Sequence, residues 1–79
     1  MTFEAVKSII HNEIMGDPSR ITPEALFKED LGVDSIEIFD IWFALEDAFD
    51  IELTDDEVFR LVCVADAVRL VEQKTERAA

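Results

Sequence analysis

One segment constrains the fold of this chain more than any other: an apolar helix expected over residues 35–49. Its sequence is S-I-E-I-F-D-I-W-F-A-L-E-D-A-F, and it follows a turn that contains Gly32. Asp34 is a good N-cap residue, and Glu37 stands three positions later, as in a capping box. On a helical wheel, one arc is apolar and is assigned to the core; it holds Ile38, Ile41, Trp42, Leu45, Ala48 and Phe49.

The same helix carries a second apolar strip that this core does not need. Ile36, Phe39 and Phe43 lie between the core arc and the polar arc. Exposed apolar patches with a charged rim usually mark interaction sites. We therefore expect a docking surface on this strip, rimmed by the acidic side chains of Asp40, Glu46 and Asp47.

Helical spacing also marks the N-terminal segment and predicts a helix over residues 3–15. Gly16 is expected to end it, because Asp17-Pro18 follows directly. The connection over residues 16–33 is long, but a short helical turn is expected at residues 22–25. Apolar anchors should keep this connection ordered: Ile21, Leu26, Phe27, Leu31 and Val33.

The C-terminal third predicts one short and one longer helix. Thr54 and Glu57 form a capping box that opens a helix over residues 55–61. A helix over residues 65–74 follows, with an apolar face made of Val64, Ala67, Val68 and Val71. We therefore expect one all-α domain over residues 1–79, with three main helices, one short helix and a long ordered loop after the first helix.

Charge and composition exclude several classes of function. The net charge is −12 with seven basic residues, which excludes ordinary nucleic-acid binding and disfavours anionic membrane surfaces. An acidic domain is instead steered towards basic patches on proteins. The chain has one cysteine and charges throughout its first residues, and no apolar run approaches a membrane span. These features predict a cytoplasmic protein without stable membrane insertion.

Catalytic and metal sites are poorly supported. A nucleophilic Ser35 would need a base, but the single histidine, His11, falls on the polar side of its helix. One Cys and one His cannot make a structural zinc site, and neither acidic loop has the EF-hand spacing. We expect no catalytic residues and no metal ligands. Cys63 is interpreted as a small apolar filler, with a reactive thiol as the alternative. Phe59 either points outwards or covers a buried pocket.

Ser35 itself has two interpretations. It can share the capping of the helix with Asp34, which is a common role for serine. It can also present its hydroxyl for attachment at an exposed helix start, directly after the L-G-V-D turn and beside the spare apolar strip.

A longer pattern resembles a known family. L-F-K-E-D-L-G-V-D-S-I, followed by A-L-E-D-A-F-D-I-E-L, is similar to free-standing acyl carrier proteins, which bind phosphopantetheine; V-K-S-I-I and V-A-D-A-V extend the resemblance over nearly the whole chain. The resemblance implies a four-helix bundle of acyl-carrier type. It also implies that Ser35, with Asp34 in the attachment motif, carries 4'-phosphopantetheine through a phosphodiester and that the thiol of this arm holds acyl groups as thioesters.

The resemblance further implies a carrier rather than an enzyme, working as a monomer. Its partners would be a phosphopantetheinyl transferase and acyl-loading, ketosynthase or acyltransferase enzymes with basic docking patches. Ile36, Asp40 and Glu46 match docking positions of the family, and the bundle is expected to open between its second and third helices for an apolar chain. The resemblance implies a role in fatty-acid, polyketide or specialised lipid biosynthesis. The bulk of Phe39 and Phe43 favours a specialised carrier, for polyketide, lipid-modifying or other secondary pathways, over the standard fatty-acid pathway. An aminoacyl or peptidyl carrier and an unmodified acidic adaptor are the alternatives.

Overall fold

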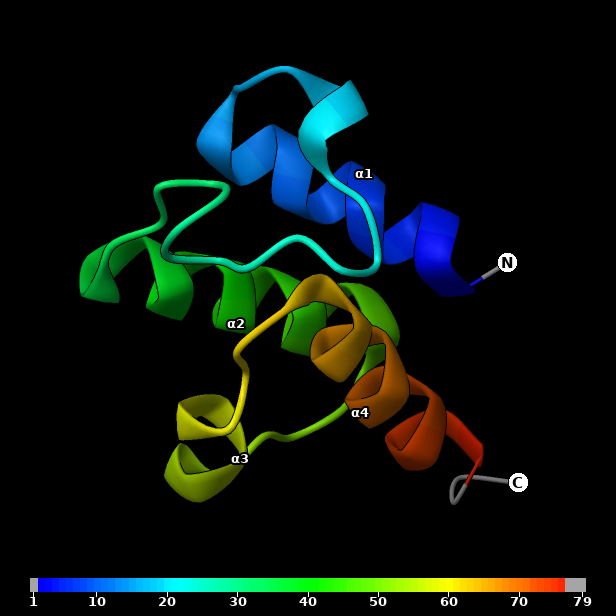
Figure 1. Ribbon diagram of the computed structural model, residues 1–79. Coiled ribbons are helices and arrows are strands. Elements are labelled where there is room, and N and C mark those ends of the chain that lie inside the picture. Colours follow the sequence, from blue (N-terminus) through cyan, green and yellow to red (C-terminus); the bar gives the residue numbers. More distant parts are fainter. Residues whose placement is uncertain (1, 77–79) are drawn as a thin grey trace.

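The computed structural model describes residues 2–76 and shows an all-helical fold over them. Figure 1 shows four α-helices and a 3₁₀ turn, η1: α1 (Thr2–Ile14), η1 (Pro18–Arg20), α2 (Ser35–Phe49), α3 (Asp55–Phe59) and α4 (Val64–Glu76). Strand pairing in the described residues is limited to one isolated bridge, between Leu26 and Cys63. The predicted helical fold with a long loop after the first helix is confirmed.

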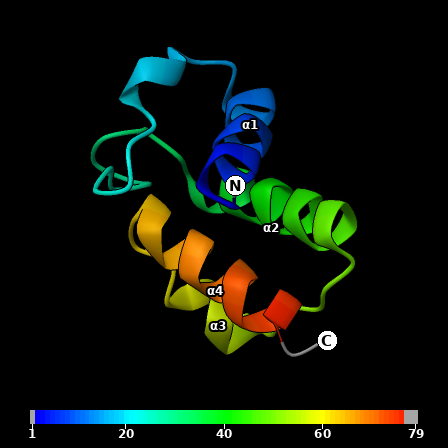
Figure 2. The ribbon, with the colours of Figure 1, turned by 90° about the vertical axis from the view of Figure 1, so that its right-hand side faces the viewer.

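Three long helices surround the core, and the short helix lies apart from α1. α1 and α2 run side by side in roughly opposite directions, with α4 against both (Figures 1 and 2). α3 lies on the far side of the molecule from α1. None of the helices in residues 2–76 is long and apolar enough to cross a membrane.

The main core joins α1, α2, α4 and the long loop. The apolar spacing of α1 and α4 predicted their inner faces, and Val6, Ile10, Val64 and Val71 are all fully buried. Each such side chain stabilises the fold by about 1.5–3 kcal/mol relative to an exposed position. The whole cluster comprises Val6, Ile10, Ile21, Ala25, Phe27, Val33, Ile41, Leu45, Val64, Ala67 and Val71.

The long loop is ordered because it is bonded to the α3–α4 connection. Phe27 N donates to Val62 O at 3.0 Å, and Val64 N donates to Ala25 O at 3.0 Å. Val33 N closes the last turn before α2 by donating to Phe27 O at 2.8 Å. The anchors Ile21, Phe27 and Val33 are buried, as predicted, whereas Leu26 and Leu31 are only half-buried.

A smaller cluster lies between α2 and α3. Trp42, Leu53 and Val58 are buried there, so the assignment of Trp42 to the core is confirmed. Among the described residues, the indole Nε1 of Trp42 is buried without a hydrogen-bond partner. Leaving such a donor unpaired costs about 1–3 kcal/mol.

The structure corrects local predictions in the first half of the chain. The helical turn lies at Pro18–Arg20, capped by Asp17, and residues 22–25 form a turn closed by Ala25 N donating to Thr22 O. The left-handed residue that ends α1 is Met15, with φ 56°, rather than Gly16. The side-chain cap at Asp17 and the buried Ile21 determine where the turn Pro18–Arg20 forms. Helical periodicity alone does not determine that position.

Three predicted environments also differ. Ala48 was placed in the core arc but is exposed, because the chain leaves α2 two residues later through a left-handed Asp50. His11, expected on the polar side of α1, is half-buried, and Cys63, interpreted as a small apolar filler, is also only half-buried. α3 ends at Phe59, two residues before the expected end, because Arg60 N already bonds to Glu57 O in a tighter turn.

Candidate functional site

Ser35 is the first residue of α2, and it is exposed. Capping is performed by Asp34, whose Oδ1 accepts hydrogen bonds from Ile36 N at 3.0 Å and Glu37 N at 2.8 Å. Glu37 completes the box by accepting from Asp34 N at 3.2 Å. Within the described residues the Ser35 hydroxyl has no hydrogen-bond partner, so the capping interpretation of Ser35 is not needed.

The turn before Ser35 fixes the direction in which the helix begins. Gly32 has φ +66°, a left-handed backbone conformation that residues with a Cβ atom rarely adopt. Val33, next to it, is buried in the core. A buried anchor and a capped helix therefore hold Ser35 rigidly at the surface.

A groove of about 270 Å³ opens beside Ser35. Its apolar walls come from the long loop, from α2 and from the α3–α4 connection, and its polar residues lie at the loop and the helix start. The lining residues are Phe27, Lys28, Glu29, Val33, Asp34, Ser35, Ile38, Leu61 and Val62. Apart from Asp34 and Ser35, sequence reasoning assigned none of these to the site, because the groove joins segments that are distant in the chain.

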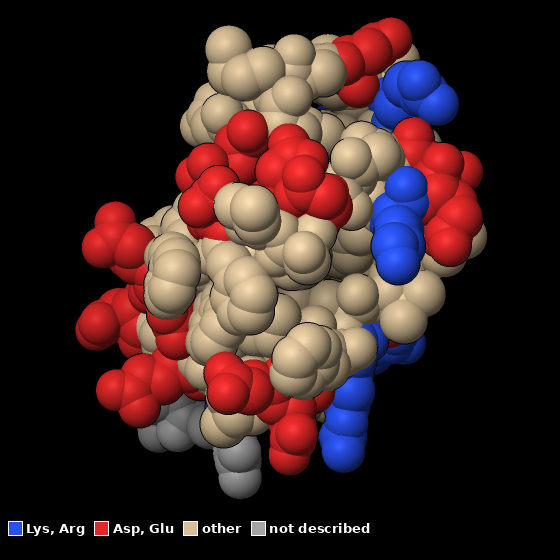
Figure 3. All heavy atoms as spheres, turned by 90° about the vertical axis from the view of Figure 1, so that its left-hand side faces the viewer, with Lys and Arg blue, Asp and Glu red and all other residues tan. Residues whose placement is uncertain are grey.

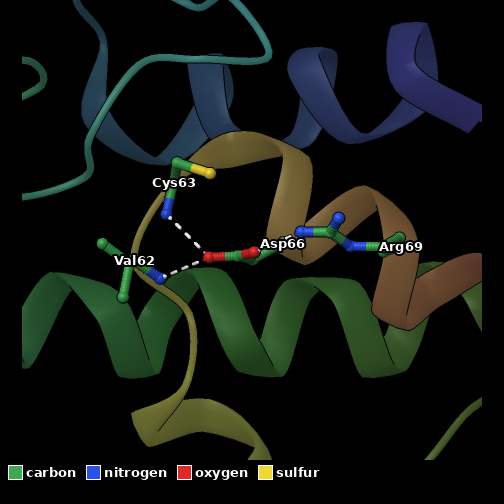
Figure 4. Close-up of polar contacts among 4 residues, drawn as sticks. All are labelled: Val62, Cys63, Asp66 and Arg69. Carbon is green, nitrogen blue, oxygen red and sulfur yellow. Dashed lines mark hydrogen bonds and ion pairs between the residues drawn. The ribbon is translucent and has the colours of Figure 1, made fainter.

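The corner between α3 and α4 holds one wall of this groove in place (Figure 4). Asp66 Oδ2 accepts hydrogen bonds from Val62 N at 3.1 Å and Cys63 N at 3.2 Å, and its other oxygen pairs with Arg69. Burial alone would raise the pKa of Asp66, but the hydrogen bonds from Cys63, Val62 and Arg69 outweigh it and lower that pKa below its usual value. The ionised carboxylate thus fixes the segment that carries Val62.

The spare apolar strip of α2 is exposed as predicted. Ile36 is 72% exposed, Phe43 58% and Phe39 38%. The ring of Phe39 packs against Trp42 in a tilted arrangement with 5.3 Å between centroids, and the ring of Phe43 stacks on the same indole at 5.3 Å. Buried Trp42 therefore supports both exposed rings.

Two further exposed apolar side chains lie outside α2, one on α3 and one on the α3–α4 connection. Phe59 on α3 is 77% exposed and Val62 is 57% exposed. Phe59 therefore points outwards, which is the first of its two interpretations. The signal was present in the sequence: in so short a helix, burying Val58 leaves its neighbour Phe59 to face solvent. Figure 3 shows uncharged surface bordered by carboxylates on the face formed by the start of α2 and by α3.

The acidic rim is less uniform than expected. Asp40 and Asp47 are exposed and free to meet a partner. Glu46 is half-buried, and its Oε2 accepts a hydrogen bond from Leu53 N at 2.8 Å. Glu46 therefore ties the α2–α3 connection to α2, a structural role that helical periodicity did not reveal.

The described residues contain no group of three or more His, Cys, Asp or Glu side chains placed to hold a metal ion. The site offers instead an accessible hydroxyl beside a partly apolar groove. These features fit a prosthetic group attached covalently to Ser35, because the hydroxyl is free and a groove is available to an attached chain.

Comparison with known proteins identifies the family. The sequence profile described as a phosphopantetheine attachment site matches residues 4–71. An acyl carrier protein of Clostridium acetobutylicum is 41% identical over 76 residues, covering 96% of this chain and 99% of the relative. An acyl carrier protein of Helicobacter pylori is 37% identical over 70 residues, covering 89% and 90% respectively.

The two relatives match this chain almost end to end. The profile that matches it is defined by attachment of the prosthetic group phosphopantetheine. We conclude that the chain belongs to the acyl carrier protein family, as a phosphopantetheine-dependent carrier rather than a catalyst.

Proposed function

We propose that Ser35 is the residue to which 4'-phosphopantetheine is attached, and that the chain presents acyl thioesters to enzymes of fatty-acid, polyketide or specialised lipid biosynthesis. The observation that carries this proposal is the state of the Ser35 hydroxyl. It is exposed at a rigid helix start, spared from capping by Asp34, and placed at the edge of the groove.

The chain's own residues position the hydroxyl but do not activate it. Asp34 is committed to two backbone N–H groups, and the single histidine lies on α1 rather than at the start of α2. A transferase must therefore remove the Ser35 proton and supply coenzyme A. The new P–O bond forms at Ser35 Oγ while the adenosine bisphosphate part of coenzyme A leaves. The attached arm then supplies a thiol for thioester chemistry.

Intact mass after modification tests this assignment. The chain is incubated with a broad-specificity phosphopantetheinyl transferase and coenzyme A, and one phosphopantetheine addition is expected. Ser35→Ala should abolish the addition, whereas Ser8→Ala, an exposed serine on α1, should retain it. An unmodified wild-type chain, under conditions that modify a control carrier, would leave the acidic adaptor as the better description.

We propose that partner enzymes dock on the apolar strip of α2, with Asp40 and Asp47 attracting a basic patch. Both carboxylates are exposed, and a carrier that must leave its partners suits a small interface with charge steering. Glu46 is not changed in a test of the acidic rim, because its carboxylate accepts a hydrogen bond from Leu53 N. The bulky rings of Phe39 and Phe43 would select partners with a correspondingly wide apolar depression.

Charge reversal tests the docking face. The double variant Asp40→Lys with Asp47→Lys should slow modification by the transferase roughly tenfold or more at low salt, because steered association loses its attraction. The matched control, Glu13→Lys with Glu72→Lys, makes the same change of charge on exposed positions of α1 and α4. Equal slowing in both variants would show that only net charge matters. Phe43→Ala removes an exposed ring without changing the charge, and so measures the apolar contribution of the strip to docking.

A further inference from the structure

The groove beside Ser35 has an uneven distribution of charge. Among the described residues that line it, Lys28 is the only basic one, while Glu29 and Asp34 are acidic. Glu37 lies close by, since it caps Asp34 N. A phosphodiester on Ser35 would therefore carry its negative charge into a region that already holds several carboxylates.

The start of α2 has little free donor capacity to offset this charge. Backbone N–H groups often bind phosphate at a helix start. Here Ile36 N and Glu37 N both donate to Asp34 Oδ1, so within the described residues Ser35 N is the one N–H group of this first turn that remains free. A basic side chain at the groove would supply additional positive charge.

Lys28 is held where it can act in this way. It lies in a tight turn in which Asp30 N and Leu31 N donate to Leu26 O, and Asp30 Oδ2 accepts from Leu26 N. Its neighbour Phe27 is buried. The ion pairs among the described residues join Arg69 to Asp66 and Lys74 to Glu57, so they leave the ammonium of Lys28 unpaired.

We propose that Lys28 is a positioning residue for the phosphodiester on Ser35. Its ammonium attracts the phosphate oxygens across the mouth of the groove, so that the first part of the attached arm lies along the apolar wall formed by Leu61 and Val62. This inference rests on the proposed attachment at Ser35, and it assigns to Lys28 a charge that the capped helix start supplies only in part.

Phosphorus NMR of the modified chain tests the pairing. Wild type, Lys28→Gln, Lys28→Arg and Arg20→Gln are modified enzymatically, and intact mass first confirms that each carries the group. The ³¹P shift of the phosphodiester is then followed from low to high NaCl, because salt screens an exposed ion pair. Arg20→Gln is the control, since it removes an exposed charge from the same loop at a position outside this groove.

The expected result is a salt-dependent ³¹P shift in wild type that is mostly lost in Lys28→Gln, restored in Lys28→Arg and unchanged in Arg20→Gln. Modification should also lower the melting temperature of Lys28→Gln by about 1–5 °C more than it lowers that of wild type. Modified chains with identical ³¹P salt responses in wild type and Lys28→Gln would overturn the role of Lys28 and leave attachment at Ser35 standing. Failure to modify wild type at all would instead overturn the attachment.

Discussion

The two apolar clusters of this chain differ in how they are held together. The main core contains fully buried side chains from three long helices and the loop, among them Ile10, Ile41 and Leu45. The cluster under α3 has only Trp42, Leu53 and Val58 as buried members, and it includes an unpaired indole N–H. The α3 side of the molecule thus has less apolar burial to stabilise it.

Polar contacts compensate on the α3 side. Thr54 and Glu57 form a capping box, Glu57 pairs with Lys74 at 2.9 Å, and Glu46 holds Leu53 N. Regions with few buried contacts and exposed hydrogen bonds open locally at lower free energy than a well-packed core. The comparison therefore predicts that α3 opens locally at lower free energy than the three long helices.

The largest expected effect contrasts a core truncation with one under α3. Ile41→Ala should reduce the free energy of unfolding by about 2–5 kcal/mol, because it leaves a cavity in the main core. Val58→Ala should reduce the free energy of unfolding by about 1–3 kcal/mol. It should also increase amide hydrogen exchange in α3 more than in α1. Urea unfolding gives the first quantity and native-state exchange the second. Equal increases of exchange in both helices would contradict a separate α3 unit.

Glu46 provides a test of intermediate size. Glu46→Ala removes the acceptor of Leu53 N and should cost about 1–3 kcal/mol, with loss of exchange protection at Leu53. Asp47→Ala removes the adjacent exposed carboxylate, and its free energy of unfolding should stay within about 0.5 kcal/mol of the wild-type value. If the two variants unfold at the same urea concentration, Glu46 belongs to the exposed rim after all.

The smallest expected effect is on the pH dependence of the free energy of unfolding. The pKa of Glu57 is lowered by the hydrogen bond from Thr54 N, and that of Asp66 by its contacts with Cys63, Val62 and Arg69, which outweigh burial. For a lowered pKa, the stabilisation is fully present above the unfolded-state value near pH 4 and disappears as the pH falls through the folded-state value.

Asp66→Asn should therefore be less stable than wild type at pH 6 by about 1 kcal/mol or less, and the difference should shrink below about pH 4. Thermal melts from pH 6 to pH 2.5 measure it, with Asp47→Asn as the charge-matched control. A difference in stability that stays constant over this range would show that the ionised Asp66 carboxylate does not hold the α3–α4 corner.

Features that depend on neighbouring residues were predictable from the sequence. The apolar spacing of α1, α2 and α4, and the capping boxes at Asp34 and Thr54, act over three or four residues, so the pattern contains them. The exposed strip of Ile36, Phe39 and Phe43 followed from the same spacing. The family pattern around Ser35 was readable for the same reason, since its residues are contiguous.

Only the tertiary structure decided which distant segments meet. The hydrogen bonds from Phe27 N to Val62 O and from Val64 N to Ala25 O bring the loop against the α3–α4 connection, and so form the groove that contains Lys28. The path of the chain after α2 brings Leu53 N to the Glu46 carboxylate and leaves Ala48 exposed. Helical periodicity specifies a face but not what covers it, because the covering segment is chosen by burial and hydrogen bonding across the whole chain.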